Sequence, residues 1–276
     1  MNGDGLTGKR LFDTHCHIFR HGLRGPLGRM GDLDAELMEY EKFRTHQGIQ
    51  QALVIGYDGL NGKISHSGNS AYIRELAQDR PWMIPLGYEA IPGLRKRIRS
   101  GSSVSAYAVA PGSGRLLATE LMDARENGAV PRILSVNATP DEIAAMVPAL
   151  VEMTRTWVLL AHLGLPGPVG NVRQARTRLV PIVSVARCAH VSIKLSGQYA
   201  ASRLPHPHRD VRLIVDFVAA EVGIERLVWG SDFSPCLAHE TLDQSVDIVF
   251  PTGCSESDRE DIRWRNADRM LGTYGQ

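Results

Sequence analysis

The sequence predicts an α/β protein that folds as a single (β/α)8 TIM barrel. Eight short apolar runs are spaced along 276 residues, and segments with helix signals lie between them. Unbroken apolar runs such as ALVIG, WVLLA and RLVWG are typical of parallel strands that are buried on both faces. Eight strands alternating with helices at this length favour a barrel over the alternative, an open doubly wound sheet.

The apolar runs give the expected strands in chain order. They are Leu11–Thr14, Ala52–Gly56, Met83–Tyr88, Val104–Ala110, Arg132–Val136, Trp157–Ala161, Val191–Leu195 and Arg226–Gly230. The chain has no internal repeat and no linker rich in Pro, Gly or Ser, so we expect residues 1–276 to form one domain. The polar, glycine-rich segment 57–70 is expected to cover one end of the barrel.

Three segments between or after these runs carry helix signals. Thr139–Glu142 has the pattern of a capping box with proline at the first helical position, and an apolar stripe at helical spacing follows it. A second stripe, over 211–222, stops at Gly223. We expect Ser257 and Glu260 to cap the last helix and Gly272 to end it.

The composition excludes several classes of protein. Hydrophobic residues make up 43% and charged residues 22%, as in an ordinary globular chain. The formal net charge is +1, which predicts neither nucleic-acid nor membrane-surface binding. No apolar run reaches the ~20 residues of a membrane span, and the polar N-terminus lacks a signal-peptide pattern. Four scattered cysteines indicate a reducing cytoplasm.

The strongest chemical signal is the segment LFDTHCHIF at the first strand. His15 and His17 are two residues apart, so on a strand they project to the same face, whereas Cys16 points away and is expected to pack. Active sites of barrels lie at the carboxyl ends of the strands. Two imidazoles there could bind a divalent metal or polarise a carbonyl. A chance pair is the alternative, because His206 and His208 form a second one in a proline-rich loop.

Two more polar residues directly follow predicted strands. His162 comes after WVLLA, and Asp232 comes after RLVWGS. With His15 and His17 they would place four ionisable side chains at one end of the barrel, where a buried carboxylate needs a partner or a metal. The alternatives are a histidine bonded to a loop carbonyl for His162 and an N-cap or turn residue for Asp232.

Taken together, these segments resemble the amidohydrolase superfamily. The closest similarity is to the amidohydrolase-related (type 2) family, in the branch that includes 2-pyrone-4,6-dicarboxylate lactonase. The resemblance rests on DTHCHIF, AHLGLP, SIKLSGQY, LVWGSDFSP and NADRMLG, in that order. It implies a TIM barrel in which His15, His17 and His162 match the family's strand-end histidines. Asp232 matches the aspartate that handles the proton of the water. Three further residues of the SIKLSGQY segment are implied as substrate contacts: Lys194, Ser196 and Tyr199.

The sequence departs from the metal-bearing members at two strands. The fifth strand, RILSVNA, offers only Ser135 and Asn137 where a histidine or lysine is common, and the fourth strand offers no acidic or lysine ligand. The lactonase branch shares these departures and includes members that work without a metal. Two forms therefore stay open: one divalent ion, Zn or Mn, held by His15, His17 and Asp232 with His162 as a further ligand, or no metal. The fourth strand also lacks the branch's dicarboxylate-binding arginines, so a pyrone dicarboxylate is not the expected substrate.

The leading hypothesis is a hydrolase that cleaves a lactone, ester or amide of a small molecule by attack of water. Asp232 is the expected general base, and His15, His17 and His162 would polarise the carbonyl or hold the metal. A metal-dependent non-oxidative decarboxylase on the same scaffold is the second hypothesis. A barrel that binds a small ligand without catalysis is the third. Nothing in the sequence decides for or against a homo-oligomer.

Overall fold

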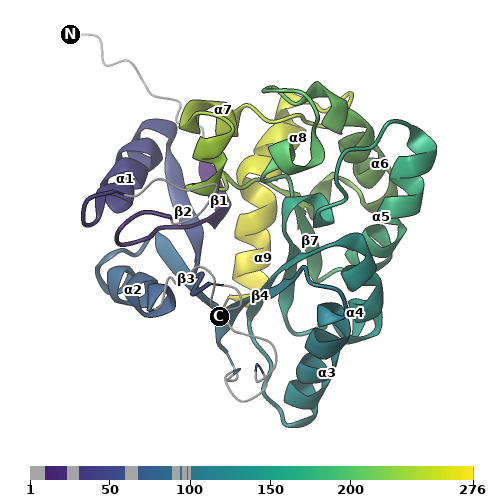
Figure 1. Cartoon of the computed structure of the whole chain (residues 1–276), viewed down its shortest axis with the longest axis horizontal. Coiled ribbons are helices and arrows are strands. Elements are labelled where there is room, and N and C mark those ends of the chain that lie inside the picture. The colour runs from purple at the N-terminus through teal and green to yellow at the C-terminus, as the bar shows by residue number, and fades with distance from the viewer. Residues whose placement is uncertain are drawn as a thin grey trace.

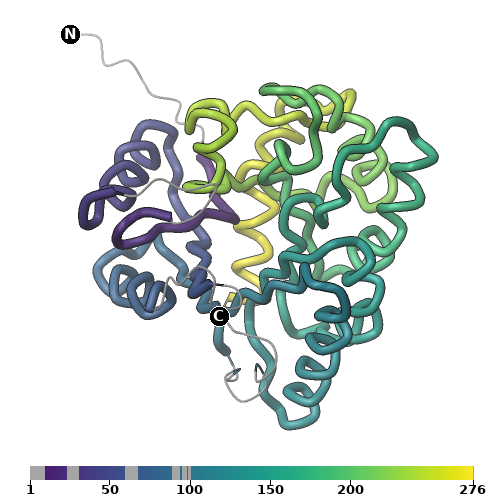
Figure 2. Tube along the Cα trace, in the orientation of Figure 1, coloured from purple at the N-terminus to yellow at the C-terminus, as the bar shows by residue number. Residues whose placement is uncertain are grey.

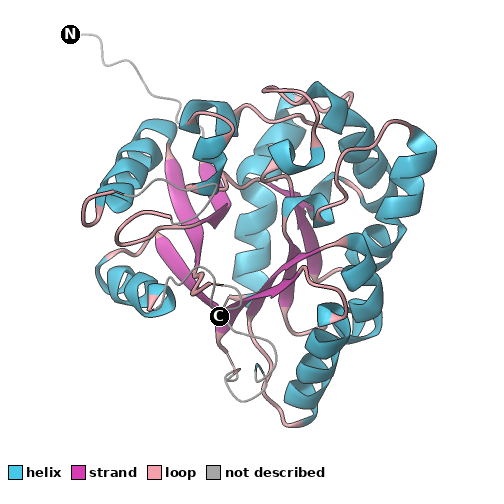
Figure 3. Ribbon diagram, viewed as in Figure 1, coloured by secondary structure: helices cyan, strands magenta, loops and turns pink. Residues whose placement is uncertain are grey.

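The protein is an eight-stranded parallel barrel surrounded by helices. The computed structural model describes residues 10–23, 31–59, 68–88, 94, 98 and 101–275, and residues 60–67 of the predicted covering segment lie outside this part. Each strand pairs with the next in the order β1 to β8, and most helices lie on the outside of the strands (Figure 3). A parallel bridge between Cys16 and Phe233 joins the last strand region to the first. The predicted (β/α)8 fold is confirmed.

Each of the eight predicted runs overlaps a strand. The strands are β1 Leu11–Cys16, β2 Ile49–Ile55, β3 Met83–Tyr88, β4 Ser103–Ala108, β5 Ile133–Ala138, β6 Trp157–Leu160, β7 Val191–Lys194 and β8 Leu227–Val228. The eighth is two residues long because the chain beyond it turns toward β1. There the Thr14 amide donates to the carbonyl of Trp229 at 3.0 Å. Gly230 permits this approach, since a Cβ on it would lie 2.8 Å from the Cβ of His15.

The helices follow the strands around the barrel, as the colour sequence of the trace shows (Figure 2). The α-helices of the described part are α1 Ala35–Gln47, α2 Asn69–Leu76, α3 Ser113–Glu126, α4 Pro140–Glu152, α5 Val172–Ala186, α6 Arg212–Val222, α7 Leu242–Val246, α8 Glu256–Glu260 and α9 Asn266–Tyr274. As predicted, α6 ends at Gly223, whose φ is 83°. Among the described helices, none is both long and apolar enough to cross a membrane.

The capping box predicted at Thr139–Glu142 is wrong, although α4 begins with Pro140 as expected. The Thr139 side chain makes no capping hydrogen bond. Glu142 turns to the neighbouring helix instead, and its carboxylate accepts hydrogen bonds from the amides of Gly112 at 2.9 Å and Gly114 at 2.6 Å. These amides belong to the first turn of α3, which has no intrahelical acceptors for them. A glutamate of one helix therefore caps the next helix, a pairing that a local sequence pattern does not reveal.

The predicted limits of the last helix are also wrong. Ser255, two residues earlier than expected, caps α8 in a capping box with Asp258. A π-helical turn over Asp261–Arg265 then connects α8 to α9. Gly272 stays inside the helix, which continues to Tyr274, because a glycine weakens a helix without ending it when the packing continues beyond it.

The final helix closes the amino-terminal end of the barrel. Phe12, Trp157 and Leu159 point into this end and form one apolar cluster with Ala267 and Met270 of α9. The ring of Phe12 packs edge-on against Trp157 at 6.5 Å between centroids. In Figure 1, α9 lies between the strands of the two halves of the barrel. With this end filled by apolar side chains, polar chemistry is restricted to the opposite, carboxyl-terminal end of the strands.

Candidate active site

A bulge in β1 places both histidines of the first strand inside the barrel. Asp13 pairs with Ala52 of β2, but the next paired residue, Cys16, faces Val54, so β1 contains one extra residue here. The bulge shifts the alternation of side chains by one position. Phe12 points inward before the bulge, and His15 and His17 point inward after it. Cys16 is buried between them with its thiol toward the carbonyl of Leu53, as the sequence predicts.

Asp13 holds this bulge against the turn after β8. One carboxylate oxygen accepts hydrogen bonds from the amides of His15 at 3.0 Å and Ser231 at 2.9 Å. The other accepts from the hydroxyls of Tyr40 at 2.8 Å and Ser231 at 2.5 Å. Burial raises the pKa of Asp13 to about 6, and these hydrogen bonds oppose the increase. Asp13 was not among the predicted site residues, and its only signal in the sequence is an acidic residue two positions before His15.

Two site residues have a backbone conformation that is unusual for their type. His162 follows β6 with φ of 51°, and Asp232 follows β8 with φ of 56°. The left-handed region costs a residue with a Cβ roughly 1–2 kcal/mol. Such conformations concentrate at functional sites because the surrounding structure must enforce them. Here the Asp232 amide donates to the His15 carbonyl at 2.7 Å, which fixes the residue against β1.

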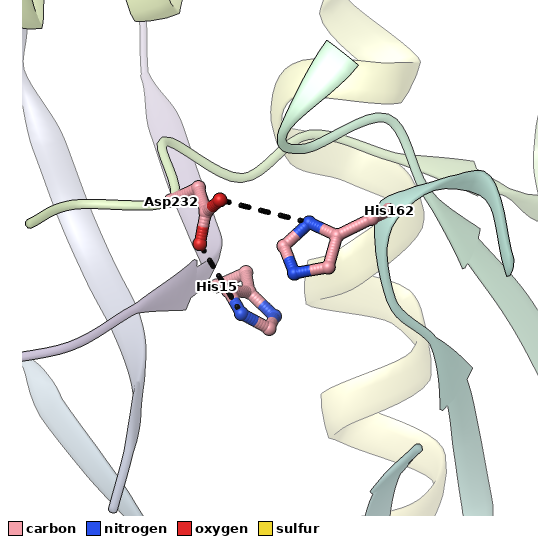
Figure 4. A group of neighbouring side chains, drawn as sticks. All are labelled: His15, His162 and Asp232. Carbon is pink, nitrogen blue, oxygen red and sulfur yellow. Dashed lines mark ion pairs between the residues drawn. The ribbon is translucent and has the colours of Figure 1, made fainter. Parts of the chain in front are cut away.

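The four predicted residues converge at the carboxyl end of the barrel. Asp232 lies between two imidazoles, with Oδ1 3.5 Å from His15 Nε2 and Oδ2 3.7 Å from His162 Nδ1 (Figure 4). The Nε2 atoms of His15 and His17 are 3.2 Å apart. All four side chains are buried, with at most 8% of each residue exposed. Residues 15 and 232 are therefore brought together by closure of the barrel, as the strand-end pattern predicts.

The three residues predicted to contact substrate lie against this cluster. Lys194 is fully buried, and its Nζ lies 3.1 Å from His15 Nδ1 and 2.9 Å from the Ser135 hydroxyl. The Ser196 hydroxyl is 3.2 Å from His162 Nδ1. The Tyr199 hydroxyl donates to Asp232 Oδ2 at 2.5 Å. Each of the three thus has a contact with a cluster side chain, and their contact with a substrate stays a prediction.

Burial brings Asp232 and Lys194 to similar pKa values. It raises the pKa of Asp232 to about 7, while the Tyr199 hydrogen bond and the charge of Lys194 act in the opposite direction. It lowers the pKa of Lys194 to about 7. Burial and the charge of Lys194 also lower the pKa of His162 to about 4. At neutral pH the site therefore contains a neutral His162 and an aspartate close to its midpoint of ionisation.

Gly197 packs closely against the side chains of His162 and Asp232. It follows Ser196 in the loop after β7 with φ of +56°, and a Cβ on it would lie 2.5 Å from His162 Nδ1 and 2.9 Å from Asp232 Oδ2. Only a residue without a Cβ satisfies both the conformation and the space. The glycine of the KLSG segment thus sets how closely the loop approaches the cluster.

The cluster has the composition and spacing of a site for one divalent metal. His15, His162 and Asp232 each offer a ligand atom, and these atoms lie within 4.8 Å of one another. His17 Nδ1 is 2.9 Å from the carbonyl of Ile55, so it donates there and leaves Nε2 unprotonated in the neutral ring. The His15–His17 separation of 3.2 Å is close to the ~3.3 Å edge of a tetrahedron with zinc–nitrogen bonds of about 2.0–2.1 Å. These residues fit such an ion.

Comparison with known proteins agrees with the fold. A family model described as Amidohydrolase matches residues 113–273, which include His162 and Asp232. No curated protein sequence matches the chain. An amidohydrolase from Burkholderia multivorans with bound zinc is similar in structure, with a TM-score of 0.72 and 18% identity over 95% of this chain and 99% of that chain.

Two further structures with other activities share the fold. A probable 2-pyrone-4,6-dicarboxylic acid hydrolase from Acinetobacter baumannii with bound citric acid gives a TM-score of 0.65 at 16% identity, covering 95% of this chain and 99% of that chain. A 5-carboxyvanillate decarboxylase from Novosphingobium aromaticivorans with bound manganese gives 0.50 at 13% identity, covering 85% and 80%. At these identities the similarity shows the shared fold, and the reaction has to be argued from the site.

Proposed function

Because this chain belongs to the amidohydrolase family, whose model matches more than half of it, we propose that it hydrolyses a lactone, ester or amide of a small organic molecule. One observation carries the proposal: a buried carboxylate, Asp232, lies between His15 and His162 with its pKa raised to about 7. A base whose pKa is near the working pH is the most effective general catalyst.

Asp232 is positioned to accept a proton from an attacking water. Tyr199 donates to Oδ2, which leaves Oδ1, on the side of His15, to receive the proton. The protonated Asp232 then donates this proton to the leaving alcohol or amine, which restores the carboxylate. Each proton taken from water therefore leaves with the product, and the enzyme ends the cycle unchanged.

The imidazoles stabilise the negative charge that develops on the carbonyl oxygen. His162 is neutral because burial lowers its pKa. Its Nδ1 faces Ser196 and Asp232, so its Nε2 is turned toward His15 (Figure 4). An N–H donor held in a buried site stabilises an oxyanion strongly because water does not compete with it. Lys194, in contact with His15 Nδ1, adds a further donor to this network.

One Zn or Mn ion held by His15, His17 and Asp232, with His162 as a further ligand, would fit the same site. When bound, such an ion polarises a carbonyl and lowers the pKa of a coordinated water. With an ion in the site, Lys194 would orient His15 and Tyr199 would orient the Asp232 carboxylate, through the hydrogen bonds described above.

We expect the purified chain to bind one zinc ion, and His15→Ala to bind it at least tenfold more weakly. Loss of one imidazole removes a ligand from a buried set. Isothermal titration of the chelator-treated protein with zinc chloride measures this, and His206→Ala, a histidine in a surface loop, is the matched control. Equal zinc affinity in His15→Ala would rule out the metal site. Full hydrolytic activity after chelation would show that hydrolysis needs no metal.

The pH dependence of the metal-free protein should follow Asp232. Because the ionised carboxylate is the base, we expect kcat/KM to increase about tenfold per pH unit below pH 7 and to level off above it. The charge of Lys194 lowers the pKa of Asp232, so Lys194→Met should move this rise to higher pH. A pH–rate profile shows the shift, and Arg187→Met, which removes an exposed cation, should leave it in place. A profile that is flat between pH 5 and 8 contradicts the assignment.

A substrate panel tests the reaction class itself. Dihydrocoumarin, aryl acetates and sugar lactones report hydrolysis, and release of CO2 from hydroxybenzoic acids reports decarboxylation. Hydrolysis of at least one lactone or ester, lost in Asp232→Asn, is the expected result. Release of CO2 without hydrolysis would favour the lyase, and no activity with any compound would favour the non-catalytic barrel.

A further inference from the structure

Three tyrosines form a wall beside the catalytic cluster. Tyr57 follows β2, Tyr88 ends β3 and Tyr107 lies near the end of β4, so the three come from adjacent strands at the same end of the barrel. Their ring centroids are 5.8 Å apart for Tyr57–Tyr88, 5.1 Å for Tyr57–Tyr107 and 5.6 Å for Tyr88–Tyr107. All three are half-buried. We call them the tyrosine wall.

The strand next to the wall carries one buried polar atom without a partner among the described residues. Asn137 lies opposite Tyr107 in the β4–β5 pairing, and its Oδ1 is buried without a hydrogen bond in the described part of the chain. A buried acceptor left unsatisfied costs roughly 1–3 kcal/mol, so native structures seldom keep one without a use. A ligand that donates a hydrogen bond to Asn137 would satisfy it.

The wall is connected to the catalytic cluster on two sides. On β5, Ser135 lies two residues before Asn137, so both point to the same face, and Ser135 contacts Lys194 beside His15. On β2, the carbonyl of Ile55 accepts from His17, and Tyr57 follows two residues later. The charge of Asp232 also contributes to raising the pKa of Tyr107. A molecule held on the wall is therefore next to the general base.

The strands beneath the wall are neutral. The sequences of β2 to β5, IQQALVI, MIPLGY, SVSAYA and ILSVNA, contain neither lysine nor arginine. A carboxylate placed against the tyrosines would lose its hydration without gaining a cation from these strands. The cation beside β5 is Lys194 of β7, which is engaged with Ser135 and His15. Aromatic faces instead favour flat apolar rings, which stack or pack edge-on against them.

We propose that the tyrosine wall binds an uncharged planar ring, such as an aryl ester or a benzo-fused lactone, whose hydroxyl group donates to Asn137. This assignment rests on the proposed hydrolase function and specifies its substrate class. A ring held against Tyr107 in this way turns its scissile carbonyl toward Asp232 and the histidines.

Hydrolysis kinetics test the ring preference. Tyr107→Leu should raise KM for dihydrocoumarin about 3- to 10-fold, the factor that corresponds to one aromatic pair contact, while the Asp232-dependent limb of the pH profile stays in place. Tyr274→Leu, at the opposite end of the barrel, is the matched control. Equal KM values of Tyr107→Leu and Tyr274→Leu for dihydrocoumarin would overturn the proposal. A preference of the unsubstituted protein for glucono-δ-lactone over dihydrocoumarin would overturn it as well.

Binding without turnover separates this proposal from the hydrolase assignment. In Asp232→Asn protein, resorcinol should bind more tightly than myo-inositol in a saturation-transfer NMR titration. Adding Asn137→Leu should weaken resorcinol about 5- to 10-fold through loss of one hydrogen bond, and leave 1,3-dimethoxybenzene, which cannot donate, unchanged. Equal effects on both rings overturn the role of Asn137. Resorcinol binding to a protein that hydrolyses no compound would refute the hydrolase and leave the wall intact.

Discussion

Asp232→Asn lowers kcat/KM by about 10²- to 10⁴-fold while the protein stays folded, because the amide cannot accept the proton of the attacking water. Asparagine keeps the shape of the side chain, and its carbonyl oxygen can still accept from Tyr199. The substitution also removes the cost of burying a charge beside His15. We expect an unfolding midpoint at least as high as that of the unsubstituted protein.

Asp247→Asn is the matched control for this experiment. Asp247 carries the same side chain, 76% exposed, and pairs only loosely with His206 at 3.7 Å. Its substitution should change neither kcat/KM nor the melting temperature. If Asp232→Asn hydrolyses the best substrate at the unsubstituted rate, Asp232 is not the base, and the mechanism proposed above fails at its first step.

Gly197→Ala reduces kcat/KM by about 100-fold, the effect of displacing reacting groups by roughly 1 Å. The added methyl group would lie 2.5 Å from His162 Nδ1 and 2.9 Å from Asp232 Oδ2, so one of these side chains has to move. The left-handed backbone adds a stability cost of about 1–2 kcal/mol. Steady-state kinetics and thermal unfolding measure the two effects separately.

Gly128→Ala isolates the backbone cost from the steric one. Gly128 has φ of +71°, but a Cβ on it would meet no atom within 4 Å. We expect Gly128→Ala to lose a similar amount of stability and to keep its full activity. Equal activity of the two alanine variants would mean that the cluster tolerates the methyl group, which contradicts the packing described around Gly197.

The barrel could be predicted because each strand is encoded locally. Runs such as WVLLA are buried on both faces, and this burial shows directly as unbroken apolar sequence. The ends of the helices could not be predicted in the same way. Glu142 caps α3 rather than its own helix. Gly272 stays helical because Met270 and Tyr274 pack against the amino-terminal end of the barrel.

The same distinction between local and long-range information applies to the candidate site. His15, His17, His162 and Asp232 follow from one rule, that parallel strands bring their carboxyl ends together. What surrounds them depends on pairs that are distant in sequence, such as Asp13 with Ser231 or Tyr57 with Tyr107. The bulge in β1 left no sign in the sequence, because His15 and His17 keep their two-residue spacing with or without it.

The bond between Asp13 and Ser231 spans 218 residues, and this distance has a consequence for biosynthesis. At ~5–20 residues per second, a ribosome needs roughly 10 to 45 seconds to make the intervening chain. During that time the first strand has emerged without the partner that closes its free edge. In the nascent chain, His15 and His17 therefore belong to an incomplete barrel. The catalytic site can form only after the segment with Ser231 and Asp232 has been synthesised.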